Sequence, residues 1–387
     1  MAAARCLVST GGIICRVCKP VTFFMIVESC LPTAEHDTMA LVRFFHPVNE
    51  ATAIAPARKL CSAPPRLLCL LCMVWIVFFV ASTVCAATPQ LDRQIAITMD
   101  DLPASNAYAM DAATITDINW KIVATLREQK IPAIGFVNED KLYKSGQVDQ
   151  RIQSLAVWVD SGLDLGNHTF RHLSLNQGGL RAFEEDVVRG ETVTRILLQQ
   201  HQMKLRYFRH PYLDAGRDLQ TRREAEAFLA ARGYRVAPVT VDAWDWMFGT
   251  VYEDAKRHGD EKLEQELVHL YLSHTDAVLS WTEQLSRELV RYEIKQVLLL
   301  HANQMEADHL KDLLDLLRRR GYRFISLDDA LMDPAYSLPD TYVGEEGTDW
   351  LTHWAITRGK PPQGHPEIPA SVADRYNSLP RPASTPY

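Results

Sequence analysis

Two histidines stand four residues apart in the stretch "GNHTFRH", residues 166–172. Imidazole nitrogens are common metal ligands, and two histidines at this spacing can reach one ion from the same side of a helical turn. The chain contains 13 histidines, so a pair of surface histidines is the simpler interpretation of this stretch alone. Whether His168 and His172 bind a metal therefore has to be decided from other parts of the chain.

Polar clusters recur along the chain after short β-rich runs. Five runs are followed in this way: "DDLP" after "IAITM", "NHTFRH" after "LDLG", "RHPY" after "RYF", "DAWDW" after "RVAPVTV" and "HANQ" after "QVLLL". In a parallel β/α barrel the loops after the strands converge at one end and carry the active site. We therefore expect these five clusters to meet at one face of the fold.

Each cluster also has an ordinary explanation. Asp100 and Asp101 could form a turn or cap a helix, and Arg209 could belong to a surface turn. The "DAWDW" cluster could be an exposed aromatic edge, and His301 could be a buried histidine of the core. Five such accidents would all have to fall at the same end of the strands, and this coincidence favours a site.

The residue types suggest hydrolysis assisted by a metal. One carboxylate and two imidazoles, from Asp101, His168 and His172, would leave an open position for water, as in catalytic zinc sites. Consecutive strand residues point in different directions, so Asp100 can take another role and accept a proton from that water. His301, from a different strand, can protonate the leaving group.

Strands alternating with helices indicate the fold class. Seven runs are too apolar for half-exposed strands, which predicts a mostly parallel sheet: "RQIAITM", "IPAIGFV", "LDLG", "RYF", "YRVAPVTV", "KQVLLL" and "YRFISL". Helical patterns cover residues 116–130, 154–161, 180–202, 219–232, 261–292 (expected to be broken) and 307–320. Without a glycine-rich phosphate loop after the first strand, we favour a barrel over an open doubly wound sheet, and a nucleotide enzyme is not expected.

Together, "TMDD", "HTFRH", "RHPY", "DAWDW" and "LLLH" resemble, in this order, the five motifs of the polysaccharide deacetylases (NodB homology, carbohydrate esterase family 4). The resemblance spans about residues 93–332. It implies a distorted (β/α)7 barrel that removes N-acetyl groups from amino sugars in a glycan, such as peptidoglycan or a chitin-like polymer. It also implies one divalent metal, usually zinc and sometimes cobalt.

By this resemblance Asp100 is the base, and Asp101, His168 and His172 hold the metal. Arg209 would orient Asp100.

The remaining roles also come from the resemblance. The backbone N–H of Tyr212 would help to stabilise the oxyanion. His301 would be the acid, and a carboxylate partner, Asp245, would raise its pKa. Trp246 and Leu299 would form the walls of a pocket for the acetyl methyl group.

The first motif departs from the family pattern T-F-D-D-G, because Leu102 and Pro103 follow the two aspartates here. This change reshapes the loop beside the base and is expected to narrow the groove. We therefore expect the change to affect binding of a long polymer substrate more than catalysis itself. Two alternatives stay open: a metal-dependent amidase or O-acetyl esterase acting on a smaller substrate, and a sugar-binding pseudoenzyme.

An uncharged segment precedes the barrel. Its apolar run covers residues 67–84, basic residues precede it, and Cys85, Ala86 and Ala87 follow, as in a secretory signal. We expect cleavage and export to the periplasm or medium, with anchoring of the protein in the membrane by residues 67–84 as the alternative. All eight cysteines lie before residue 88.

We therefore divide the chain into an N-terminal extension of uncertain start (1–65), a signal peptide or anchor (66–87), a catalytic barrel (93–335), and a C-terminal strap and flexible tail (336–387). A short helix is expected in "DWLTHWAITRGKPP". Residues 88–387 carry 34 basic and 44 acidic side chains, a net charge of −10. Such a surface argues against nucleic acid as a partner, and no motif implies a protein partner.

Overall fold

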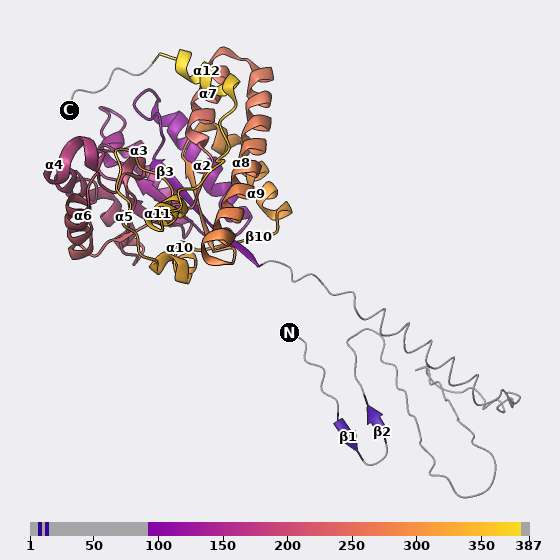
Figure 1. The fold of residues 1–387 in the computed structure, drawn as a ribbon. Coiled ribbons are helices and arrows are strands. Elements are labelled where there is room, and N and C mark those ends of the chain that lie inside the picture. The colour runs from indigo at the N-terminus through magenta and orange to yellow at the C-terminus, as the bar shows by residue number, and fades with distance from the viewer. Residues whose placement is uncertain (1–6, 10–11, 15–91, 381–387) are drawn as a thin grey trace, which may run out of the picture. The chain divides into compact units, whose positions relative to one another are not determined.

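The computed structural model describes residues 7–9, 12–14 and 92–380 (Figure 1). The chain divides into two compact units, Met1–Ala87 and Thr88–Tyr387. In the first unit, β1 (Leu7–Ser9) and β2 (Gly12–Ile14) pair antiparallel. The expected signal peptide or anchor, residues 66–87, lies outside the described residues. Within the described ranges, no helix has the length and apolar character needed to cross a membrane.

A parallel sheet forms the centre of the second unit, with strand order β7-β6-β5-β4-β3-β9-β8 and with β10 also paired to β3. Its strands are β3 (Arg93–Leu102), β4 (Ala133–Val137), β5 (Asp164–Asn167), β6 (Tyr207–Phe208), β7 (Arg235–Val236), β8 (Val241–Asp242), β9 (Gln296–His301) and β10 (Tyr322–Ile325). Each of the seven predicted runs overlaps a strand, and "YRVAPVTV" overlaps both β7 and β8. The predicted parallel sheet is confirmed.

The two ends of this strand order, β7 and β8, belong to one bent stretch of chain. The N–H of Ala237, just after β7, still donates to the carbonyl of Phe208 in β6, at 2.8 Å. Three residues later, the N–H of Thr240 donates to the carbonyl of Val297 in β9, at 3.0 Å. The stretch thus leaves one edge of the sheet and joins the other. It curls the sheet into the distorted (β/α)7 barrel that the sequence predicts.

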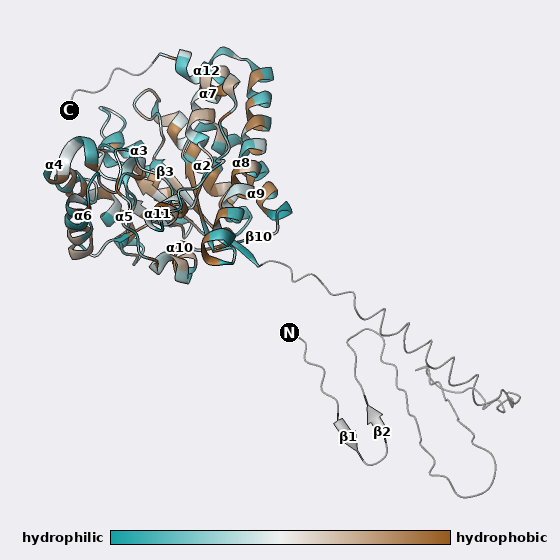
Figure 2. Cartoon of the chain, viewed as in Figure 1, coloured by the Kyte–Doolittle hydropathy of each residue, from teal (hydrophilic) through white to brown (hydrophobic). Residues whose placement is uncertain are grey.

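Helices surround the sheet. The larger ones are α2 (Ala112–Glu128), α3 (Val148–Asp160), α4 (Leu175–Arg189), α5 (Thr192–Gln200), α6 (Leu219–Ala231), α7 (Asp245–His258), α8 (Glu261–Val290) and α9 (Gln304–Arg319). The helix predicted over 180–202 is in fact two helices, α4 and α5. The predicted break in 261–292 is wrong, because α8 buries residues along its whole length, from Leu267 to Ser286. In Figure 2, hydrophilic residues gather along the outer side of α8.

The C-terminal region contributes two more helices. The short helix expected in "DWLTHWAITRGKPP" is confirmed as α11 (Trp350–Thr357). Residues assigned from sequence to a flexible tail include α12 (Ala370–Ser378). This helix packs on α7, where the rings of Tyr376 and Trp246 meet edge to face with centroids 5.3 Å apart.

The pleat of the central strands sorts side chains onto two faces. On β3, Ile95, Ile97 and Met99 belong to the large core cluster that also contains the buried faces of the helices. The alternate residues, Thr98 and Asp100, are buried on the opposite face of the strand.

The inner face of the barrel changes character along the strands. Ala96, Ile134 and Val297 form an apolar cluster toward its amino end. Asp100 and His301 follow at the carboxyl end, and they are register partners in the pairing of β3 with β9. The strand ladder therefore places the predicted base and the predicted acid side by side.

Gly190, at the end of α4, supports the loop that carries the two histidines. A Cβ here would lie 2.6 Å from the backbone carbon of Thr169 and 2.7 Å from the nitrogen of Phe170. Gly190→Ala should therefore reduce the free energy of unfolding by about 1–3 kcal/mol, because backbone atoms cannot move aside as a side chain can. Denaturant titration would measure this loss.

Gly178→Ala is the matched control. The nearest atoms there belong to the side chain of Leu173, at 2.7 Å and beyond, and a rotamer change can relieve the contact. An equal or larger loss of stability in Gly178→Ala would contradict the close-packing explanation.

Candidate active site

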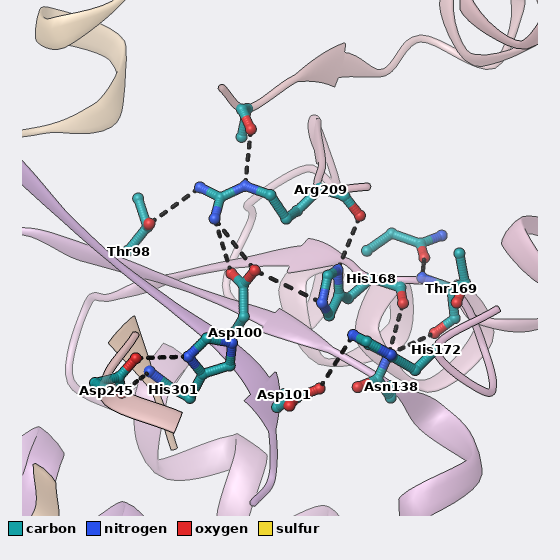
Figure 3. Close-up of polar contacts among 12 residues, drawn as sticks. Thr98, Asp100, Asp101, Asn138, His168, Thr169, His172, Arg209, Asp245 and His301 are labelled. Carbon is teal, nitrogen blue, oxygen red and sulfur yellow. Dashed lines mark hydrogen bonds and ion pairs between the residues drawn. The ribbon is translucent and has the colours of Figure 1, made fainter. Parts of the chain in front are cut away.

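Asp100 is held by a buried arginine. Arg209, which follows β6, places Nη1 3.1 and 3.2 Å from the two carboxylate oxygens of Asp100 (Figure 3). The rest of its guanidinium donates to Thr98 Oγ1 at 3.0 Å and to the carbonyl of Ala237 at 2.7 Å. The Phe136 ring lies beneath it, with its centroid 4.6 Å from Cζ. These contacts fix Arg209 and leave the carboxylate of Asp100 little freedom to rotate.

Burial raises the pKa of Asp100 to about 6, although the charges of Arg209 and His301 lower it. A carboxylate with a pKa close to neutrality is well matched to general-base catalysis. The geometry thus agrees with the role that the sequence predicts for Asp100.

Asp101, His168 and His172 come together as one cluster. Each offers a donor atom, and the three atoms all lie within 4.8 Å of one another. The ligands of a tetrahedral zinc ion are about 3.4 Å apart, and Nε2 of His172 lies 3.7 Å from Oδ1 of Asp101. The donor types and spacing fit a divalent cation after small movements.

Both histidines favour the uncharged imidazole form, in which a ring nitrogen can bind a metal. Nδ1 of His168 lies 2.8 Å from the carbonyl oxygen of Arg209, and an N–H there would leave the lone pair of Nε2 free for a metal. Burial lowers the pKa of His168 well below its usual value and that of His172 to about 4.

The two histidines do not share a helical turn, as the spacing alone allowed. They lie in a loop after β5, and Thr169 and His172 have φ values of 63° and 61°, which a right-handed helix does not accept. The side chain of Asn138 fixes this loop by donating to the carbonyl of His168 at 2.6 Å.

His301 is paired with Asp245, the first residue of α7. Asp245 accepts hydrogen bonds from the backbone N–H of His301 at 2.7 Å and from Nδ2 of Asn303 at 3.2 Å. Its other oxygen lies 2.7 Å from Nδ1 of His301. Burial opposes the charged imidazolium, but the charge and the hydrogen bond of Asp245 raise the pKa of His301 to about 10. His301 is therefore kept in the protonated form, in which it can donate a proton.

Tyr212 lies beside the donor cluster formed by Asp101, His168 and His172. It takes a left-handed conformation with φ of 57°, and its ring meets that of His172 edge to face, with centroids 4.4 Å apart. Leu299 is buried on β9 and is the register partner of Thr98, whereas Trp246 contacts Tyr376. The predicted pocket formed by Trp246 and Leu299 stays a prediction.

Leu102 and Pro103, the residues by which the first motif departs from the family pattern, are both buried. Leu102 is buried in the large core cluster, and its side chain occupies the space beside Gly135, where a Cβ would come within 2.1 Å of it. Pro103 is also buried, and its carbonyl accepts a hydrogen bond from Asn119 at 2.7 Å. Leu102 thus packs into the core, and the effect of the altered motif on the width of the groove stays a prediction.

Three contributing residues escaped the sequence analysis: Thr98, Asn303 and Lys141. Thr98 is two residues before Asp100 on the same face of β3, so strand alternation could have indicated it. Lys141 follows β4 at its carboxyl end and donates to Oδ1 of Asp101 at 2.9 Å. The same rule that indicated the other clusters would have indicated "NEDK", residues 138–141.

Residues 87–230 match the family model described as polysaccharide deacetylase. This match covers part of the chain and agrees with the family that the motifs predict.

Several solved structures are similar to this chain. A family 4 carbohydrate esterase from Streptomyces lividans in complex with acetate has 16% identity and a TM-score of 0.40, covering 62% of this chain and 96% of that chain. Bacillus subtilis PdaA, another family 4 esterase, has 16% identity and a TM-score of 0.39, covering 62% and 81%. A family 4 pseudoenzyme from Bacillus anthracis has 14% identity and a TM-score of 0.40, covering 62% and 66%. No curated protein matches the chain.

Replacing Asp245 tests the electrostatic control of His301. In Asp245→Asn the charge that contributes most to raising the pKa of His301 is lost while burial still lowers it, so the pKa should fall from about 10 toward its usual value of about 6.5. Titration of the imidazole by NMR would measure the shift, with His301→Gln used to assign the resonance. A pKa that stays near 10 in Asp245→Asn would contradict the pairing.

Proposed function

We propose that this protein is a metal-dependent deacetylase that hydrolyses the N-acetyl group of an amino sugar in a glycan, such as peptidoglycan or a chitin-like polymer. One observation carries the proposal. The carboxylate of Asp100, the proposed base, and the imidazole of His301, the proposed acid, are register partners on adjacent strands. The three donors of Asp101, His168 and His172 lie beside them. Amide hydrolysis needs this combination of groups.

The donor cluster would hold one divalent ion, with zinc favoured by its carboxylate and imidazole ligands and cobalt as the alternative. When bound, such an ion lowers the pKa of a coordinated water and polarises the acetyl carbonyl.

The side chains of the site then share the remaining tasks. Asp100, oriented by Arg209, takes a proton from the attacking water. The backbone N–H of Tyr212 stabilises the negative charge on the former carbonyl oxygen. His301, kept protonated by Asp245, gives its proton to the amide nitrogen as the C–N bond breaks. Acetate and a free amino sugar leave, and Trp246 and Leu299 contact the acetyl methyl group while it is bound.

We further propose that the enzyme works outside the cytoplasm, in the periplasm or medium, or attached to the membrane. The uncharged segment before the barrel, closed by small residues, supports export. A barrel without cysteine after residue 87 is suited to an oxidising compartment.

Separate loss of the base and of a metal ligand tests the assignment of roles. Asp100→Asn should reduce kcat about 100-fold or more, as loss of a general base does, while zinc remains bound in equal proportion to protein. Asp101→Asn should lose the zinc itself, because a ligand is removed. Acetate release and elemental analysis would be measured on the same samples. Full activity in Asp100→Asn would refute its role as base.

A comparison of substrates tests the bond and the substrate class. Acetate release from chito-oligosaccharides and peptidoglycan fragments should exceed release from acetylated xylan, since His301 is prepared to protonate a poor amine leaving group. Faster release from xylan would indicate an O-acetyl esterase instead. No release from any of the three by the zinc-loaded protein would favour a sugar-binding protein without turnover.

A further inference from the structure

A buried lysine reaches the candidate metal site from outside the family's motifs. Lys141 belongs to a short 3-10 helix, η1 (Glu139–Leu142), that follows β4. Its side chain is 5% exposed. Its Nζ donates to Oδ1 of Asp101 at 2.9 Å and to the backbone carbonyl of Asp101 at 3.3 Å. One ammonium group thus contacts both the side chain and the main chain of a single residue.

The lysine is itself held in place by Arg151, which is 1% exposed. Nη1 of Arg151 donates to the backbone carbonyl of Lys141 at 2.7 Å. Its Nη2 donates to the carbonyls of Ala107 and Met110 in the loop between β3 and α2, at 3.0 and 2.8 Å. Arg151 therefore ties η1 to the loop that follows Asp101, and Lys141 cannot easily move away.

Asp101 needs such support. Its φ of 70° is left-handed, a conformation that is strained in a non-glycine residue and persists only where the surroundings enforce it. Burial opposes ionisation of its carboxyl group, but the positive charges of Lys141 and His301 hold its pKa well below the usual range. Lys141 contributes most to this effect.

We propose that Lys141 is a positioning residue that holds the carboxylate and backbone of Asp101 in the orientation facing His168 and His172. The three donors are then arranged for a divalent cation before it binds. A carboxylate oxygen has two lone pairs, so Oδ1 can accept from Lys141 and still bind an ion. The inference rests on the proposed metal site and adds a residue to it.

Lys141 also has an opposing effect. An ammonium group this close to a divalent cation repels it, so removing the charge alone would strengthen binding. Loss of the group that orients a ligating carboxylate typically weakens metal affinity 10–100-fold. The proposal is that orientation outweighs repulsion, which gives the experiment a definite sign.

Zinc affinity of the whole protein, measured by competition with a chromophoric chelator, tests the proposal without any substrate. Lys141→Met should bind zinc about 10–100-fold more weakly than the wild type. Lys141→Arg, which keeps charge and donors, should recover most of the affinity. The absorption spectrum of the cobalt-loaded protein should change in Lys141→Met, because the position of Asp101 around the ion changes.

Lys144→Met is the matched control. Lys144 donates to the carbonyl of Met110 at 2.9 Å, so it supports the same loop without touching Asp101. Its replacement should leave zinc affinity within about 2-fold of the wild type. Lys141→Leu, which also lacks the charge and the hydrogen-bond donor, replaces Lys141→Met if that variant does not fold.

Two results would overturn the inference. Equal or tighter zinc binding in Lys141→Met, or in Lys141→Leu in its place, would mean that repulsion outweighs orientation. A similar loss of affinity in Lys144→Met would mean that general order in the loop, not Lys141, positions Asp101. If the wild type itself bound no zinc, the proposed metal site would fail together with this inference, whereas a zinc-binding wild type with unaffected Lys141 variants would refute only the role of Lys141.

Discussion

The buried ion pair between Arg209 and Asp100 is the interaction on which the site depends. Charges are costly to bury unless they are paired and all their hydrogen bonds are made. Here Thr98, the carbonyl of Ala237 and the ring of Phe136 complete the surroundings of the guanidinium. These groups come from β3, β4 and the chain after β7, so the pair forms only when the barrel is assembled. Folding of the barrel and placement of Asp100 against Arg209 therefore occur together.

The site separates two neighbouring carboxylates by their surroundings. Asp100 faces the barrel interior, where burial raises its pKa toward neutrality despite Arg209. Asp101, one residue further, turns through a left-handed backbone toward Lys141 and the histidines, where its pKa is lowered. One residue is thereby suited to exchange a proton and the other to remain an anion. Two neighbouring residues of the same type thus lie in different environments, with the left-handed backbone of Asp101 turning its side chain away from that of Asp100.

Much of the fold and of the candidate site could be predicted from sequence, because both rest on local patterns. Apolar runs indicated the strands, and polar residues after them indicated Asp100, His168 and His301. Long-range contacts were not predictable in this way. The clamp of Lys141 on Asp101 joins residues 40 positions apart, and Leu102 packs beside Gly135 because two strands are neighbours. The periodicity of one segment carries no information about such partners.

The pairing of β3 with β9 has a consequence for how this scaffold can change. Asp100 and His301 are register partners, so the spacing between them is set by main-chain hydrogen bonds of the sheet rather than by any loop. Loops around the mouth of the barrel can therefore be lengthened, shortened or replaced while Asp100 and His301 keep their separation. Sequence changes at the rim can accumulate without disturbing the arrangement of these two side chains.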